Sequence, residues 1–455
     1  MLKTAGINKQ LETACVKGDL KLVDALIKKG PTRSLRWKMA FRASCAGGNE
    51  AIVDIMYRKL IKKGEETLSA DQWTEGLLGA ATGGQMKMVL RALENGAHIT
   101  LEALYCSCSG GNVDIVELFL KKPDCVDVDV NIAFSRAYEA GHSLLAYKFL
   151  EMGANSWKLC FLAAKLRRDK EMVAKMISLG AGYWSGSFAI TLTFGDIAEN
   201  NVGMQRIGEL ANDGFSKLDL VAAKTKFEKM GCKCELVHIN NGLNGVLGSE
   251  DAENAYILVI RDAVGHILSA GEDNTLVELL AEQLILEWDT KAKMRGAVKN
   301  KNARYNLCYG QNRQEPDYEN GNGRIVAFED VPLTQKLQKT LPEFIGEKAN
   351  NLVCEGNLYY DTDTTGIGYH GDSERRRVVA VRLGASIPLH YMWFKNGTPQ
   401  GLKTEFILNS GDMYIMGSKA VGFDWKKKKT FTLRHAAGCS KYTTYKLKKP
   451  KKSTK

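Results

Sequence analysis

Three residues in the C-terminal part of the chain have the types and spacing of a metal site. His370 and Asp372 are separated by one glycine, and His435 follows some tens of residues later. Alternate side chains of a strand point to the same face, so His370 and Asp372 can bind one ion together. Two imidazoles and a carboxylate form the facial triad that holds Fe(II) and leaves three positions open. We predict that all three residues are metal ligands and catalytic residues.

A further histidine, His390, is the alternative for the distal ligand. It follows Asp372 closely and lies in the middle of a predicted strand, which is more typical of a core or substrate-facing residue. His435 stands near the end of a later strand, before a glycine turn. We therefore favour His435.

Four apolar runs after the His-x-Asp motif predict the strands that position these residues. Each run is short and is bounded by glycine or polar turn residues, as buried strands are. The runs are Val378–Gly384, Ile387–Phe394, Met413–Met416 and Thr430–Gly438.

These motifs resemble the AlkB-like branch of the Fe(II)/2-oxoglutarate dioxygenases over residues 300–447. The matching features, in chain order, are Asn357-x-Tyr359, His370-x-Asp372 with Glu374-Arg375 behind it, Gly411-Asp412 and His435. The resemblance implies a double-stranded β-helix of the jelly-roll kind. It also implies Fe(II) as cofactor and 2-oxoglutarate and O₂ as co-substrates. The implied reaction is oxidative dealkylation or hydroxylation of a nucleic-acid base, which must leave its stack to react.

The resemblance is incomplete where the family binds the far carboxylate of 2-oxoglutarate. The family uses the tyrosine of Asn-x-Tyr and an arginine after the distal histidine. Asn357 and Tyr359 match, but the segment that resembles the arginine-bearing strand carries Lys441 and Lys446 instead. Lysine is a point charge without the bidentate fork of arginine. We expect these four residues to bind the co-substrate.

The N-terminal part contains degenerate repeats. Glycines at positions 18, 48, 84, 111 and 141 each separate two predicted helices. The pattern resembles ankyrin repeats, whose period is about 33 residues, although the Thr-Pro-Leu-His signature is missing. Such an array stacks neighbouring repeats and leaves a face for partners.

The predicted domains are an α-helical ankyrin-like solenoid (residues 1–184), an α/β middle region (185–290), the dioxygenase domain (291–447) and a basic tail (448–455). The middle region combines predicted strands with an amphipathic helix. It is either a module of its own or an extension of the dioxygenase core.

Charge and composition bear on the partners. The net charge is +11, with lysine runs at Lys426–Lys429 and in the tail. Such runs attract phosphate backbones, although a solvated tail has the same composition. No long apolar run and no signal-peptide pattern occurs, and the eleven cysteines lack zinc or disulfide spacing. We expect an intracellular protein, cytoplasmic or nuclear, without a membrane span.

Two other functions remain open at this stage. The chain could hydroxylate a protein that the repeats capture. Alternatively, the repeats could act as an adaptor beside a vestigial oxygenase domain, which the missing arginine favours and the intact triad opposes.

Overall fold

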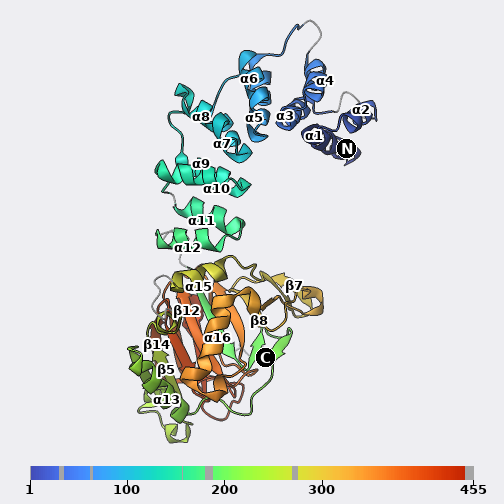
Figure 1. The fold of residues 1–455 in the computed structure, drawn as a ribbon. Coiled ribbons are helices and arrows are strands. Elements are labelled where there is room, and N and C mark those ends of the chain that lie inside the picture. Colours follow the sequence, from blue (N-terminus) through green and yellow to red (C-terminus); the bar gives the residue numbers. More distant parts are fainter. Residues whose placement is uncertain are drawn as a thin grey trace. The chain divides into compact units, whose positions relative to one another are not determined.

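The computed structural model describes residues 2–29, 35–61, 65–155, 157–179, 188–268 and 275–445 (Figure 1). The chain divides into two compact units, Met1–Asp169 and Lys170–Lys455. The first unit is helical, and the second mixes helices with strands. In the described ranges, no helix has both the length and the apolar character needed to span a bilayer.

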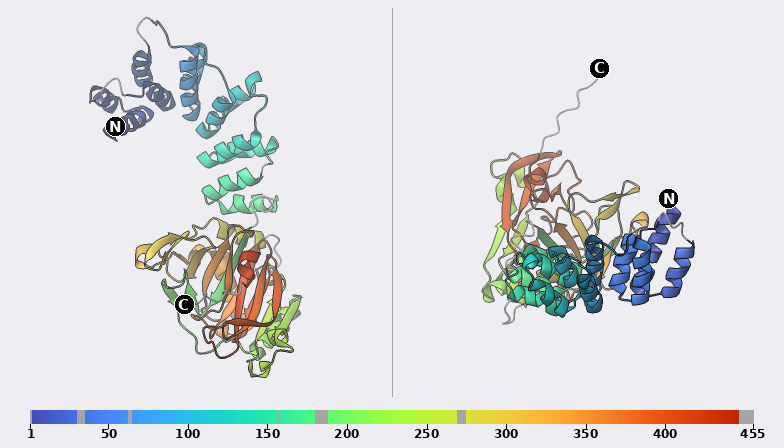
Figure 2. Two further views of the ribbon diagram at one scale, coloured as in Figure 1. Left: turned by 180° about the vertical axis from the view of Figure 1, so that it is seen from behind. Right: turned by 90° about the horizontal axis from the view of Figure 1, so that it is seen from above.

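The N-terminal unit is an array of helix pairs, as the repeats predicted (Figures 1 and 2). The first helices of successive pairs pack against one another, from α1 through α3, α5, α7 and α9 to α11. The helices are α1 (Leu2–Lys17), α2 (Leu20–Lys29), α3 (Trp37–Gly47), α4 (Glu50–Leu60), α5 (Ala70–Thr82), α6 (Met86–Glu94), α7 (Leu101–Gly110), α8 (Val113–Leu120), α9 (Val130–Ala140), α10 (Ser143–Glu151) and α11 (Trp157–Leu166).

Glycine pairs explain how neighbouring repeats approach one another. A Cβ on Gly47 would lie 2.4 Å from the Cys15 carbonyl oxygen of the preceding repeat, so only glycine fits. The next residue, Gly48, has a φ of 72° and ends α3 in the left-handed conformation that glycine adopts most easily. Asn49 then caps α4 and also donates a hydrogen bond of 3.4 Å to the Gly18 carbonyl. The same arrangement recurs at Gly110-Gly111-Asn112.

The second unit contains two main sheets. The larger has the strand order β4-β5-β15-β12-β1-β10-β8-β9, and the smaller has the order β11-β16-β13-β14. The larger sheet consists of β1 (Ala189–Gly195), β4 (Cys234–His238), β5 (Tyr256–Ile260), β8 (Tyr305–Gly310), β9 (Ile325–Ala327), β10 (Val353–Tyr359), β12 (Val378–Gly384) and β15 (Met413–Met416). The smaller consists of β11 (Gly366–His370), β13 (Ile387–Lys395), β14 (Thr398–Leu408) and β16 (Thr432–Gly438). The strands predicted after the His-x-Asp motif are thus confirmed.

The hydrophobic core lies between these sheets. Val378, Ala380 and Met416 from the larger sheet belong to one buried cluster with Tyr391 and Leu433 from the smaller sheet. Two hairpin strands, β2 (Ile197–Glu199) and β3 (Arg206–Gly208), pair with each other beside the larger sheet, and β6 (Lys291–Met294) pairs with β7 (Ala297–Asn300). The helices α12 (Lys170–Ser178), α13 (Lys217–Lys229), α14 (Ala263–Leu268), α15 (Thr275–Leu284) and α16 (Pro332–Ile345) form a chain of mutual contacts, and α13 packs on β4 and β5.

The predicted domain boundaries need correction. β1, β4 and β5, which lie in the predicted middle region (185–290), belong to the same sheet as β10, β12 and β15. That region is therefore part of the core and not a separate module. α12, predicted as the last repeat, packs on α15 in the second unit. The predicted boundary at 184 and the tail (448–455) lie outside the described residues.

The segment that contains Lys441, which was expected to match the family's arginine-bearing strand, is not a strand. Its residues Ser440–Thr443 form a short helix, α17. The sheet position between β10 and β12 is occupied by β1, which pairs with each of them over seven residues.

The central place of β1 generates a stability prediction. Leu192 in β1 is completely buried, so Leu192→Ala should lower the free energy of unfolding of this unit by about 2–5 kcal/mol. Leu218→Ala is the matched control, because Leu218 is 78% exposed and its truncation should cost less than about 0.5 kcal/mol. Hydrogen exchange of the β10 and β12 amides in the full chain measures the effect. Unchanged exchange in Leu192→Ala would contradict a structural role for β1.

Candidate metal centre

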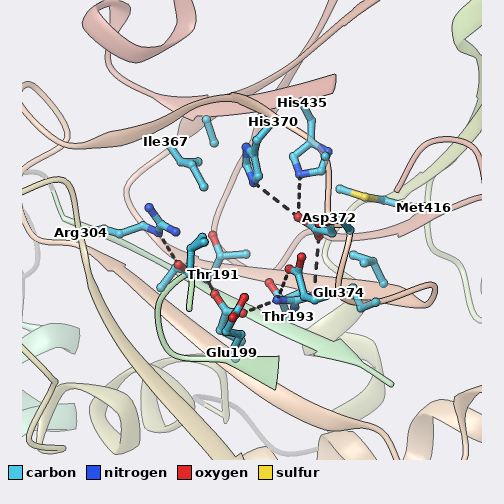
Figure 3. Close-up of a pocket in the computed structure, with 18 of the residues that line it drawn as sticks. Thr191, Thr193, Glu199, Arg304, Ile367, His370, Asp372, Glu374, Met416 and His435 are labelled. Carbon is cyan, nitrogen blue, oxygen red and sulfur yellow. Dashed lines mark hydrogen bonds and ion pairs between the residues drawn. The ribbon is translucent and has the colours of Figure 1, made fainter. Parts of the chain in front are cut away.

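The two predicted histidine ligands lie on neighbouring strands of the smaller sheet. His370 ends β11 and is the cross-strand partner of His435 on β16. Asp372 follows two residues after His370, where its backbone N–H donates to the Val421 carbonyl at 3.0 Å. Both histidines point toward Asp372, with Nε2 to Oδ1 distances of 3.5 Å each (Figure 3). The possible ligand atoms of the three residues all lie within 4.8 Å of one another, so this group could hold a metal ion.

The hydrogen bond of His370 fixes which ring nitrogen faces the centre. Its Nδ1 lies 2.8 Å from the Gly368 carbonyl oxygen, which can only accept a hydrogen bond. In the neutral ring the proton is therefore on Nδ1, and the Nε2 lone pair points toward Asp372. A backbone carbonyl on the outer nitrogen is a common way to orient a histidine metal ligand.

A buried charge network supports the carboxylate. Burial alone would raise the pKa of Asp372, but its neighbours His435, Arg375 and His370, in this order, hold it well below the usual range. The Arg375 guanidinium is itself buried, and it forms ion pairs with Glu355 and Glu374. Burial, and next the charge of His370, lower the pKa of His435.

A cavity of about 590 Å³ opens beside the three residues. Its other wall is the inner face of the larger sheet, where strand alternation aligns polar residues of β10, β1 and β12. Asn357, Thr191 and Arg382 form one row across these strands, and all three line the cavity. The cavity is therefore polar on this side and carries the candidate ligands on the other.

The remaining predicted residues fall into two groups. Asn357 and Tyr359 line the cavity. The Asn357 side-chain oxygen accepts hydrogen bonds from Arg304 at 2.6 Å and from Asn306 at 2.7 Å, so Asn357 holds neighbouring side chains in place. Lys441 lies on α17, is exposed beside the Tyr442 ring and is not among the lining residues. Lys446 lies outside the described residues.

The alternative ligand His390 is on the wrong face of the sheet. It is the cross-strand partner of Ala436, whereas the next residue, Tyr391, is the partner of His435. His390 therefore points away from Asp372, and its Nε2 lies 3.3 Å from a carboxylate oxygen of Glu405.

Sequence analysis missed Arg382 and Thr191. Arg382 lies two and four residues after Ala380 and Val378, which face the core. Because every second side chain of a strand points to the same face, the sequence alone could have placed this arginine on the inner face. Thr191 had no such signal, because its strand was not predicted at all. Trp425 also lines the cavity, while Trp393 belongs to the core.

No protein-family model matches the chain. Over 253 residues the chain is 47% identical to "Uncharacterized protein R156" of Acanthamoeba polyphaga mimivirus. The aligned residues are 56% of this chain and 96% of the viral protein. The chain belongs to the same family as this mimivirus protein. Among solved structures, it is similar to the human ASB11 ankyrin repeat domain, with 19% identity and a TM-score of 0.24, over 38% of this chain and 83% of that one.

Ligand substitutions test the metal centre. His370→Ala, Asp372→Ala and His435→Ala should each weaken binding of Fe(II) or Mn(II) by more than the roughly 10–100-fold that loss of an outer-shell partner costs. His390→Ala is the control and should bind the ion like the wild type, because His390 faces away. Calorimetric titration of the metal-free full chain measures this. Loss of binding in His390→Ala with retention in His435→Ala would reverse the assignment.

Proposed function

We propose that the chain is an Fe(II)- and 2-oxoglutarate-dependent dioxygenase that oxidises a base of a nucleic acid. The observation that carries this proposal is the convergence of His370, Asp372 and His435 at one wall of a cavity. Two imidazoles and one carboxylate suit Fe(II) and leave positions open for a co-substrate. The two facing sheets, with both histidines on inward positions of the smaller one, are what a double-stranded β-helix would provide.

The residues of the chain have separate tasks in this proposal. His370, Asp372 and His435 would hold the iron, which when bound supplies the activation of O₂. Overall, 2-oxoglutarate, O₂ and a substrate C–H group give succinate, CO₂ and a hydroxylated substrate. Arg375 keeps Asp372 ionised and oriented, and the hydrogen bond to Gly368 orients His370.

Basic side chains of the cavity lining suit an anionic substrate. Arg304 and Lys426 line the cavity, as does Arg206, which is paired with Glu199. Lys427–Lys429 follow Lys426 as an exposed basic segment at the rim of the cavity. Trp425 lies beside Lys426 on the cavity wall, and its indole N–H is buried without a hydrogen-bond partner in the described part of the chain. Basic side chains next to an aromatic ring suit a base with flanking phosphates.

A second candidate is hydroxylation of a protein. It is favoured by large apolar side chains exposed on the helical array, among them Leu144 on α10, which is 88% exposed, and Leu90 on α6. Exposed apolar side chains on a repeat array suit capture of a protein target.

Succinate release tests the chemistry. The full chain with Fe(II), 2-oxoglutarate and O₂ should release succinate, and methylated DNA or RNA should stimulate this release. Asp372→Ala should abolish it, because the carboxylate ligand is lost, while His390→Ala should retain it. Release that is equal in wild type and Asp372→Ala would contradict the proposed site.

Salt dependence tests the substrate class. If phosphates bind at the rim, log K for single-stranded DNA or RNA should fall with log salt by about 0.7 per phosphate contact. Lys427→Ala/Lys428→Ala should reduce this slope by up to about 1.4, whereas Lys291→Ala/Lys299→Ala, which removes two exposed lysines of the β6–β7 hairpin, should not. Fluorescence anisotropy measures the affinities. Absence of salt-sensitive binding would leave protein hydroxylation as the leading candidate.

A further inference from the structure

Two buried arginines in the second unit have contrasting surroundings. Arg375 is 4% exposed and has carboxylates of Glu355, Glu374 and Asp372 within 4 Å. Arg382 is 1% exposed, yet within the described ranges it forms no ion pair with any carboxylate. Its hydrogen-bond partner is an uncharged group, since Nη1 donates to the Thr191 hydroxyl at 2.6 Å. Its Nε is buried without a hydrogen-bond partner.

An arginine cannot lose its charge in a protein, so burial without a counter-ion is costly. The cost is offset when an anion binds. Arg382 lines the cavity that also contains the candidate metal ligands, and it has the Tyr359 ring 5.9 Å from its Cζ atom. We therefore expect the counter-ion of Arg382 to be a ligand that enters the cavity from solvent, and not a side chain of the described residues.

Arg382 and the three candidate metal ligands line the same cavity of about 590 Å³. A ligand that reaches both has one group for the metal and one carboxylate for the guanidinium.

We propose that Arg382, with the Thr191 hydroxyl, is the residue that binds the far carboxylate of the 2-oxo acid co-substrate and makes the site selective for a dicarboxylate. This inference rests on the proposed function. It assigns the carboxylate-binding role to Arg382 on β12, which precedes His435 in the chain, and not to Lys441 on α17, which follows it. Arg382 would present its guanidinium to one carboxylate oxygen, and Thr191, which accepts from Nη1, can still donate its own hydroxyl proton.

The test compares two ligands that differ by one carboxylate. 2-Oxoglutarate and 2-oxopentanoate share the group that faces the metal, but only the first has a far carboxylate. Each is titrated by calorimetry into the Mn(II)-loaded full chain, so no turnover is needed. The wild type should bind 2-oxoglutarate about 10–100-fold more tightly, as a charge-assisted pair requires. Arg382→Met should remove this preference and bind 2-oxopentanoate and Mn(II) like the wild type.

Three further variants complete the design. Thr191→Val should weaken 2-oxoglutarate binding by roughly fivefold, as loss of one neutral hydrogen bond does. Lys441→Ala, on the exposed helix, should change neither affinity. Without ligand, Arg382→Met should unfold at no lower temperature than the wild type, because it removes an unpaired buried charge, but it should lose the stabilisation by 2-oxoglutarate. Arg382→Lys should recover part of the preference as a point charge.

The possible failures are distinguishable. If the wild type binds Mn(II) but neither 2-oxo acid, the proposed function is wrong. If the wild type prefers 2-oxoglutarate and Arg382→Met keeps that preference, only the assignment of Arg382 is wrong. Loss of the preference in Lys441→Ala would assign the carboxylate to Lys441. An equal loss of both ligands in Arg382→Met would make Arg382 a structural residue.

Discussion

The arrangement of the second unit depends on one strand with two distant partners. β1 pairs antiparallel with β10 on one side and with β12 on the other, over seven residues each. Because a shift by one residue turns every side chain to the opposite face, this double register determines which residues face the cavity. Thr191 meets both Asn357 and Arg382 only in this register. The polar wall of the cavity is therefore built by pairing between parts of the chain that are far apart in sequence.

Local patterns were sufficient for what depends on local structure. The apolar runs predicted β12, β13, β15 and β16, and the glycine positions predicted the helix pairs. The His-x-Asp spacing and the later His435 indicated three residues that the structure brings together. Spacing succeeded here because β11 and β16 are neighbours in the smaller sheet, so that the end of one strand meets a histidine on the other.

The rest depended on pairings that no local pattern contains. Thr191 and Arg382 are 191 residues apart, and nothing in either segment indicates the other. The resemblance implied Lys441 from its place after His435 in the chain, whereas the larger sheet brings Arg382 to the cavity by pairing. The middle region was predicted apart from the later strands for the same reason, since β4 and β5 extend the larger sheet next to β15 without being near it in sequence.

The two buried arginines that line the cavity have opposite electrostatic surroundings. Around Arg375, three carboxylates exceed one guanidinium, which leaves negative charge where a divalent cation would bind. Around Arg382, a guanidinium faces hydroxyl and aromatic groups, which leaves positive charge. In the proposed function, a metal ion and a dicarboxylate would each offset one local imbalance of charge.

The glycine pairs of the helical array have a consequence for folding during synthesis. Each junction, such as Gly47 against Cys15, joins repeats that are adjacent in sequence, so a helix pair can dock as soon as the next one has been made. β1 has the opposite situation, because both of its partners are translated long after it. Pairing of such distant segments is slow, and an unpaired apolar strand is prone to aggregation meanwhile. We therefore expect the helical array to fold during synthesis before β10 and β12 have been made. At that stage β1 has been synthesised but is still unpaired.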